Sequence, residues 1–260
     1  MVRNAGKRRK RRYHPVNSRS QSGVVTYDES FFTQQGSGSL QAAGTIVPLV
    51  LELVEPRSVI DVGCGLGSWA ATFLEQGVAD VVGVDGDYVN RERLLIPSER
   101  FIPADLTRGI PVDRQFDLAV CLEVAEHLPA NCGDQLVDEL ARLGRAVLFS
   151  AAIPHQGGTG HINERWQDEW ASVFSRHGLL PIDAIRPRVW NDPTVDCWYA
   201  QNIVLYARRD ASPELADAGA DWPLRLVHPT LYELQHAPQP LTQRAALLAK
   251  RVRRRLRRST

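Results

Sequence analysis

Residues 58–69 read SVIDVGCGLGSW and contain a strand pattern, a glycine-rich turn and the start of a helix. A short β-branched strand is expected at 58–63, and a helical pattern follows at 67–76. Gly63, Gly65 and Gly67 stand at alternate positions between them. Glycine tolerates positive φ and lets the backbone approach a ligand, while the amides of a first helical turn favour an anionic group. The stretch predicts a ligand-binding turn, although its GxGxG spacing differs from the dinucleotide fingerprint GxGxxG.

The alternation of strand and helix continues along the chain. Helical patterns lie near 132–143 and 164–177, and further strand candidates lie at 81–86, 101–106, 116–124, 146–152 and 203–208. Strands that alternate with helices predict an α/β fold with a mostly parallel sheet covered on both faces. Such sheets bind ligands beyond the carboxyl ends of their strands, so the site should lie there.

Two aspartates stand at expected strand ends. Asp85 ends VVGVDG, where an acid commonly accepts hydrogen bonds from ribose hydroxyls, and Asp105 follows the next strand in PADLTRG. An aspartate before a turn more often caps a loop or forms an Asx-turn, so that interpretation stays open for each. Taken in series, the two acids indicate a nucleoside ligand.

Composition favours one domain with appendages. The chain has 260 residues, 43 % of them hydrophobic, enough to bury one substantial core. Its cysteines form no CxxC pair and no secretory signal precedes them, so we expect reduced thiols and a cytoplasmic location. No apolar run approaches the roughly 20 residues that cross a bilayer.

The net charge of +1 hides a segregation of charges. Residues 1–12 and 250–260 each hold seven basic side chains and no acid, whereas residues 13–249 hold 17 basic and 30 acidic residues, a balance of −13. We therefore divide the chain as follows: a basic disordered tail at 1–22, a catalytic domain with a helical lead-in at 23–210, an irregular extension at 211–240 and a basic amphipathic helix at 241–260. That last helix would suit an anionic membrane surface or nucleic acid.

Four elements in order, DVGCGLG, VVGVDG, ADL and FDLAVCLEV, resemble the class I S-adenosylmethionine-dependent methyltransferases over roughly residues 45–210. The resemblance implies a Rossmann-like, doubly wound sheet of seven strands, mostly parallel with an antiparallel last strand. It also implies that the three glycines wrap the methionine moiety of the cofactor and that Asp61 orders their loop. The other cofactor residues it implies are Asp85 for the ribose, Asp105 for the adenine amine, Leu106 as an adenine wall and Tyr27 as a cover.

The segment CLEVAEHL at 121–128, with a later histidine in GHINERW, resembles a metal-dependent branch of these enzymes. That branch includes small-RNA 3′-terminal 2′-O-methyltransferases and ubiquinone-pathway O-methyltransferases. The resemblance implies that a divalent cation, Mg²⁺ or Mn²⁺, is held by Glu123, Glu126, His127 and His161. A cation that chelates two neighbouring hydroxyls would orient them and lower the pKa of the attacking one.

Each of these residues also has a simpler interpretation. Glu126 and His127 could cap the helix that follows, and His161 could be an ordinary loop histidine. Without a metal, His127 or His161 becomes the candidate general base, and His155 is a third candidate near the mouth of the site.

Three functions remain open from the sequence. The first is a methyltransferase acting on a hydroxyl of a sugar, glycan or other small vicinal diol, with peripheral contact to the inner face of the membrane through the C-terminal helix. Resemblance to methyltransferases of bacterial surface-polysaccharide pathways favours it. The second is an RNA 3′-terminal 2′-O-methyltransferase, which the acidic body disfavours because it would repel a polyanion. The third is a non-catalytic scaffold that retains cofactor binding.

Overall fold

The computed structural model describes residues 29–208 and 223–236. The basic tail expected at 1–22, Tyr27 and the amphipathic helix expected at 241–260 lie outside the described residues. The chain divides into two units, residues 1–226 and 227–260.

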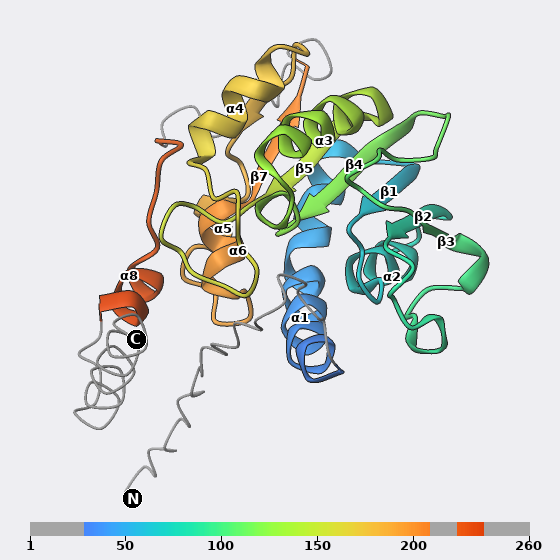
Figure 1. Ribbon diagram of the computed structural model, residues 1–260, viewed down its shortest axis with the longest axis horizontal. Helices are drawn as coiled ribbons and strands as arrows, with labels where there is room; N and C mark the ends of the chain where they lie inside the picture. The colour runs from blue at the N-terminus through green and yellow to red at the C-terminus, as the bar shows by residue number, and fades with distance from the viewer. Residues whose placement is uncertain (1–28, 209–222, 237–260) are drawn as a thin grey trace, which may run out of the picture. The chain divides into compact units, whose positions relative to one another are not determined.

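The first unit is built on a seven-stranded sheet with the order β3-β2-β1-β4-β5-β7-β6 (Figure 1). Strand β7 pairs antiparallel with both β5 and β6, whereas the other neighbouring strands pair parallel. The predicted sheet, including its antiparallel last strand, is therefore confirmed. The strands are β1 (Ser58–Val62), β2 (Asp80–Asp85), β3 (Phe101–Pro103), β4 (Phe116–Leu122), β5 (Gly144–Ser150), β6 (Leu180–Ile182) and β7 (Val204–Ala207).

Strand β1 lies between β2 and β4, and Asp61 is in register with Gly83 on one side and Val120 on the other. The strand order reverses at this point, because the chain runs outward from β1 to β3 and then returns to β4. A parallel sheet opens a crevice where its order reverses, at the carboxyl ends of the strands. The glycine turn after β1 and the segment after β4 both start at that edge.

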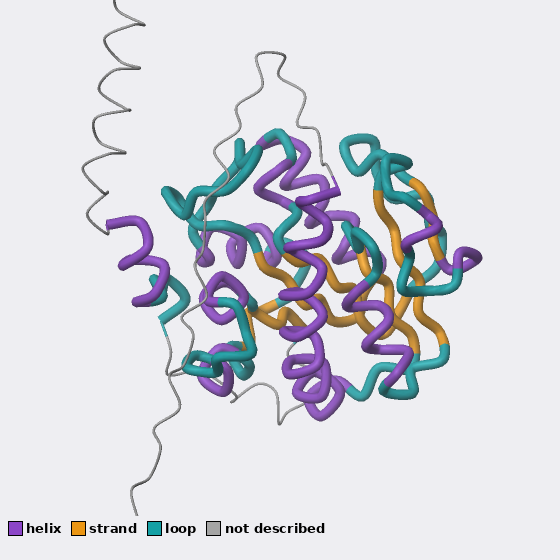
Figure 2. Tube along the Cα trace, turned by 90° about the horizontal axis from the view of Figure 1, so that it is seen from below, coloured by secondary structure: helices purple, strands orange, loops and turns teal. Residues whose placement is uncertain are grey.

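Helices cover both faces of the sheet, as Figure 2 shows in the view from below. One hydrophobic cluster packs α1 (Glu29–Val54), α2 (Ser68–Glu75), α5 (Arg186–Val189) and α6 (Cys197–Asn202) on one face. A second cluster packs α3 (Ala130–Leu143) and α4 (Gln167–Ser175) on the other. Successive strand residues alternate between the two clusters: Val147 and Phe149 face α3 and α4, and Leu148 faces the opposite side. This alternation is what makes the strands apolar throughout.

Several strand and helix ends differ from the prediction for local reasons. Strand β4 ends at Leu122 and not at 124, because Glu123 adopts a left-handed φ of +56°. Strand β3 ends at Pro103 and not at 106, because Asp105 turns the chain by accepting hydrogen bonds from Thr107. Strand β6 was not predicted, since three residues that include Pro181 carry almost no periodic signal.

The second unit contains α8 (Pro229–His236), whose first turn is capped by a hydrogen bond from the backbone N–H of Thr230 to Nδ1 of His228. The expectation of a wholly irregular segment at 211–240 is therefore wrong for these eight residues, because a proline at the first helical position and a side-chain cap favour a helix start. Among the described helices of both units, none is long and apolar enough to cross a membrane.

Candidate active site

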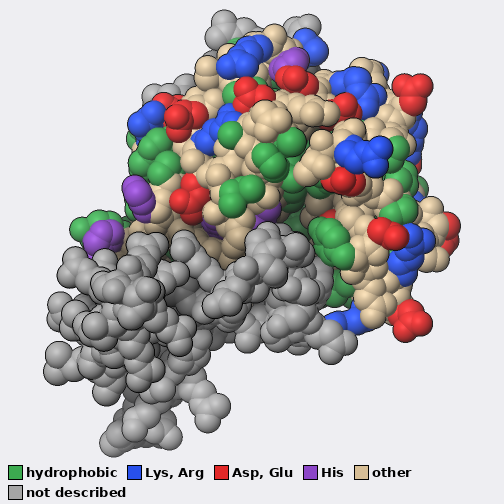
Figure 3. All heavy atoms as spheres, viewed as in Figure 1, with side chains coloured by type: hydrophobic (Ala, Val, Ile, Leu, Met, Phe, Trp, Pro, Cys, Tyr) green, Lys and Arg blue, Asp and Glu red, His purple; other side chains and the backbone are tan. Residues whose placement is uncertain are grey.

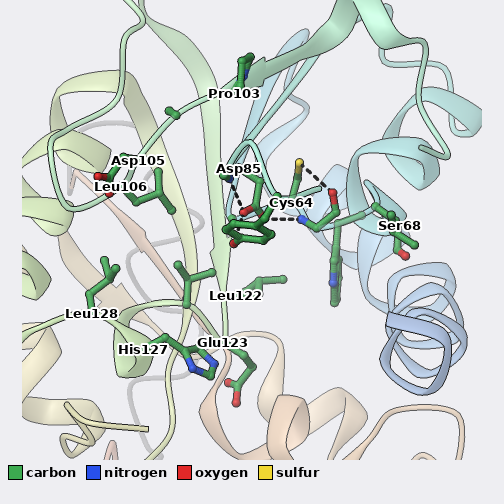
Figure 4. Close-up of a pocket in the computed structure, with 18 of the residues that line it drawn as sticks. Cys64, Ser68, Asp85, Pro103, Asp105, Leu106, Leu122, Glu123, His127 and Leu128 are labelled. Carbon is green, nitrogen blue, oxygen red and sulfur yellow. Dashed lines mark hydrogen bonds between the residues drawn. The ribbon is translucent and has the colours of Figure 1, made fainter. Parts of the chain in front are cut away.

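A cavity of about 740 Å³ opens at the carboxyl ends of β1, β2 and β4. Figure 4 shows Asp85 beside the glycine turn, Asp105 and Leu106 along another wall, and Glu123 next to His127 at a third. Most of the residues assigned to the site from sequence therefore surround one space. Its lining is made of Ser39, Gly63, Cys64, Gly65, Leu66, Ser68, Trp69, Asp85, Gly86, Asp87, Tyr88, Pro103, Ala104, Asp105, Leu106, Thr107, Leu122, Glu123, Val124, His127, Leu128 and Tyr199.

The glycines of the turn serve different purposes. Gly63 and Gly65 have φ of +77° and +56°, a region that favours glycine. A Cβ on Gly63 would lie 2.3 Å from Val124, so this position needs glycine for packing. A Cβ on Gly65 would meet nothing within 4 Å, because this residue faces the open cavity. Gly65 is the point at which a ligand can touch the backbone.

Asp85 links the glycine turn to the end of β2. Its Oδ2 accepts the N–H of Gly65 at 2.7 Å, and its Oδ1 accepts the N–H of Gly86 at 2.6 Å and the hydroxyl of Tyr88. A Cβ on Gly86 would lie 2.1 Å from the Tyr88 ring, so glycine is needed for the ring to cover the backbone there. Tyr88 was not predicted as a site residue, because its only sequence signal is an aromatic residue three positions after an acid at a strand end.

Asp61 lies beneath the turn, 2 % exposed, and accepts the N–H of Ala70 at 3.2 Å. Burial raises the pKa of Asp61 to about 7. Because this bond joins β1 to α2 across the glycine turn, Asp61 is suited to order the turn, although it does not line the cavity.

Asp105 and Leu106 line the cavity. The Asx-turn left open by the sequence is present, since Oδ1 of Asp105 accepts the N–H of Thr107 at 3.0 Å and its hydroxyl at 2.7 Å. These bonds hold the pKa of the exposed Asp105 carboxyl below its usual value. Its other oxygen, Oδ2, makes none of these bonds.

Glu126, His127 and His161 converge, with one potential ligand atom from each lying within 4.8 Å of the others. The rings of His127 and His161 meet edge to face at a centroid distance of 4.9 Å. His161 reaches this place because the backbone oxygen of Glu126 accepts the N–H groups of Ile162 at 2.8 Å and Asn163 at 3.1 Å. Burial lowers the pKa of His127 to about 4 and also lowers that of His161, so both rings are neutral near pH 7.

Glu126 is fully buried, and its Oε1 accepts the N–H of Ala152 at 3.2 Å. Its Oε2 has no hydrogen-bond partner among the described residues. Burial, and next the nearby Glu123 carboxylate, raise the pKa of Glu126 well above its usual value. A buried carboxylate oxygen without a partner is costly and indicates a ligand or a proton at that place.

Glu123 is held by amides that the sequence analysis did not identify. Its Oε1 accepts Nδ2 of Asn202 at 3.2 Å, and its Oε2 accepts Nε2 of Gln156 at 3.4 Å. Oε1 of Gln156 in turn accepts the backbone N–H of Ile153 and an amide N–H of Asn202. Because a backbone N–H can only donate, it fixes the orientation of both amides and directs their N–H groups toward Glu123. Nothing in the local sequence links these residues, which come from α6 and a distant loop.

His155 does not join the cluster. It is exposed on the loop before His161, with a φ of +68°, and its backbone N–H donates to Glu164. His155 is not part of the group formed by Glu126, His127 and His161, and its role as a general base stays a prediction.

A doubly wound sheet with an antiparallel last strand, and a glycine turn and acids around a cavity at the order reversal, define the class I methyltransferase fold. A family model described as a methyltransferase domain matches residues 39–186, more than half of the chain. The chain belongs to this family of methyltransferase domains.

Curated relatives match parts of the chain. A ubiquinone biosynthesis O-methyltransferase of Acinetobacter baylyi is 34 % identical over 104 residues, 36 % of this chain and 43 % of the relative. A ribosomal protein L11 methyltransferase of Neisseria gonorrhoeae is 30 % identical over 124 residues, 45 % of this chain and 40 % of the relative. The chain thus spans about two fifths of the length of these relatives.

Solved structures share the fold. A magnesium protoporphyrin IX methyltransferase from Synechocystis PCC 6803 with bound SAH superposes with a TM-score of 0.51 at 19 % identity, covering 68 % of this chain and 87 % of that one. A sugar N-methyltransferase from Streptoalloteichus superposes with a TM-score of 0.55 at 16 % identity, covering 75 % and 99 %. At these identities the likeness concerns the fold alone.

Proposed function

We propose that the chain methylates a hydroxyl of a sugar, glycan or other small vicinal diol, and that a divalent cation, Mg²⁺ or Mn²⁺, assists. The observation that carries this proposal is the convergence of Glu126, His127 and His161 within 4.8 Å of one another, close to the wall formed by Glu123 and His127. A curated relative named as an O-methyltransferase is consistent with a hydroxyl acceptor.

The donor set fits a divalent cation. Two neutral imidazoles and a carboxylate are ligands that Mn²⁺ and similar ions accept, and Oε2 of Glu126 is buried without a partner. Glu123 lines the cavity but does not belong to this group of three, so its role as a fourth ligand stays a prediction. When bound, such a cation lowers the pKa of a coordinated hydroxyl and orients it.

The cofactor half of the cavity follows the assignments made from sequence. Gly65 offers open backbone to the methionine moiety, Asp85 offers oxygens to the ribose, and Asp105 and Leu106 border the place for adenine. Gly63 and Gly67 shape the turn, and Asp61 supports it from below. The role of Tyr27 as a cover stays a prediction.

The chemistry needs alignment and a route for one proton. Methyl transfer is an in-line displacement, so the attacking oxygen must sit opposite the leaving sulfur. An alcohol is a weak nucleophile while it keeps its proton, and Glu126, His127 or His161 can accept that proton. Without a metal, either His127 or His161 is the candidate general base, because burial lowers the pKa of both rings and favours their neutral form.

The charge distribution supports a small acceptor. On the face in Figure 3, basic and acidic side chains are interspersed, and no continuous basic stripe is visible among the coloured residues. With the balance of −13 over residues 13–249, a long polyanion gains little attraction from this body. The RNA alternative and the proposed membrane contact at the cytoplasmic face both depend on the tails, which lie outside the described residues.

The test is transfer of radiolabelled methyl from S-adenosylmethionine into cell extract by the purified enzyme. The extract is separated afterwards into RNA, soluble metabolite and lipid or glycan fractions, with and without a chelator. Label in metabolite or glycan that vanishes with chelator supports the proposal. Label in small RNA would overturn the choice of acceptor. Label that is unaffected by chelator would show that Glu126, His127 and His161 act in acid–base chemistry or in structure and hold no required cation. If no fraction is labelled while the purified protein still binds the cofactor, the result supports the non-catalytic scaffold.

A further inference from the structure

The carboxylate of Glu164 receives three hydrogen bonds from the loop that precedes it. Its Oε1 lies 3.1 Å from Nδ1 of His161 and accepts the backbone N–H of Gly157 at 3.2 Å. Its Oε2 accepts the backbone N–H of His155 at 2.8 Å. The side chains of His161 and Glu164 are only 12 % and 22 % exposed, so solvent competes weakly for these bonds. One carboxylate therefore holds both the loop backbone and a histidine of the catalytic cluster.

The contact with Glu164 decides which nitrogen of His161 carries the proton. A carboxylate only accepts hydrogen bonds, so the ring must present Nδ1–H to it. In a neutral ring the lone pair then lies on Nε2. In metal sites generally, the partner of the second ring nitrogen fixes the tautomer and the ring orientation in this way, and losing that partner weakens metal binding about 10- to 100-fold.

The loop also needs external support for its shape. His155 has a φ of +68°, which costs an L-residue about 1 kcal/mol, and Gly157 and Gly160 have φ of +73° and +79°. The N–H groups of His155 and Gly157 both end on Glu164, which holds this left-handed segment closed. The next residues, Ile162 and Asn163, are bonded to the backbone of Glu126. The loop is thus held at two points, with the His161 ring between them.

We propose that Glu164 is a positioning residue that fixes His161 in the Nδ1–H tautomer and holds residues 155–160 in the shape that brings the ring to Glu126 and His127. This inference rests on the proposed function, because it serves the ligand or proton-accepting role of His161. It adds a residue that neither lines the cavity nor belongs to the group of three, but that contacts His161 and determines which ring nitrogen carries the proton.

The test uses the full chain labelled with ¹⁵N and a long-range ¹H–¹⁵N correlation spectrum, which reports the tautomer of each histidine; His161→Asn assigns the signal. We expect Nδ1–H in the wild type and a mixture that gains Nε2–H in Glu164→Ala. In the same variant, Mn²⁺ affinity, measured from the free-ion signal in electron paramagnetic resonance, should fall about 10- to 100-fold. Glu169→Ala is the matched control: Glu169 accepts the N–H of Trp166 at 2.7 Å and is not part of the cluster, so both readouts should stay unchanged.

An unchanged tautomer together with Mn²⁺ affinity within twofold of wild type in Glu164→Ala would overturn the proposal. If the alanine variant does not fold, Glu164→Gln is used in its place. Glutamine has the size of glutamate but only one acceptor oxygen, so it must lose part of the three hydrogen bonds that Glu164 accepts. Failure of the proposed function has a different signature, because turnover would then survive His161→Ala while the tautomer still shifted in the Glu164 variants.

Discussion

The hydroxyl of Tyr88 donates a hydrogen bond to Oδ1 of Asp85, the carboxylate assigned to the cofactor ribose. Oδ1 also accepts the N–H of Gly86 at 2.6 Å, so both of its lone pairs are engaged. Tyr88 is 61 % exposed as a residue, which leaves its side chain room to move aside. The tyrosine hydroxyl therefore occupies a position that a ribose hydroxyl would need.

Tyr88→Phe should bind S-adenosylhomocysteine more tightly, because the competing hydroxyl is gone while the ring is kept. A net hydrogen bond of about 1 kcal/mol corresponds to roughly a fivefold lower Kd in calorimetric titration. Tyr232→Phe, on the exposed face of α8, is the control and should leave Kd unchanged. Weaker binding in Tyr88→Phe would show that the hydroxyl belongs to the cofactor site.

Substitutions at one end of the cavity should impair cofactor binding, and substitutions at the other end should impair turnover. Asp85→Ala should weaken binding of S-adenosylhomocysteine by tenfold or more, since it removes a charged acceptor, on the order of 1.5–3 kcal/mol. Glu126→Ala and His127→Ala should abolish turnover and leave that Kd within a few-fold of wild type. His177→Ala, which breaks only a surface pair with Asp138, serves as control. The reverse pattern would contradict the role assignments.

Because Asp61 is buried, we expect the free energy of unfolding to depend on pH. Its pKa is raised from 3.8 to about 7 in the folded state, so between these values the folded chain binds more protons than the unfolded one. The contribution of Asp61 to the free energy of unfolding is therefore fully present below about pH 4. It is lost as pH rises through 7, and the loss is at most about 4 kcal/mol.

Asp61→Asn lacks this titration, because an amide can still accept the bond from Ala70 but carries no charge. Chemical denaturation should find the variant more stable than the wild type at pH 8 by an amount that shrinks steadily toward pH 4. A difference that is constant across this range would show that Asp61 does not titrate in the folded state.

Substitution by alanine should have different effects at two glycines whose Cβ positions are open: it should impair cofactor binding at one and stabilise the fold at the other. Gly65→Ala should raise the Kd for S-adenosylhomocysteine, because its Cβ would enter the cavity, and should also strain a backbone φ of +56°. Gly44→Ala, within α1 and with nothing within 4 Å of its Cβ, should stabilise the fold by about 0.5–1 kcal/mol without affecting binding. Thermal melting and calorimetric titration of both variants test this, and equal effects on Kd would contradict the assignment of Gly65.

Local patterns were sufficient for the strands that are fully buried. Strands β1, β2, β4 and β5 were predicted within two residues, because both of their faces meet apolar clusters and the signal is continuous. The ends were less certain where one side chain redirected the backbone, as Asp105 does after β3. Strand β6 was not predicted, because an edge strand of three residues is too short to show a periodic pattern.

Short-range patterns and chain order were sufficient to predict the fold class, the glycine turn and the acids at the strand ends. The resemblance predicted Glu123, Glu126, His127 and His161 as one set. The folded structure brings Glu126, His127 and His161 together and leaves Glu123 and His155 out of that group. It also shows that Asn202 and Gln156 hold Glu123 and that Glu164 contacts His161. Hydrogen bonds that orient a side chain can join residues far apart in the chain: Glu123 and Asn202 are 79 positions apart. No local pattern encodes which distant amides a loop will bring to a strand end.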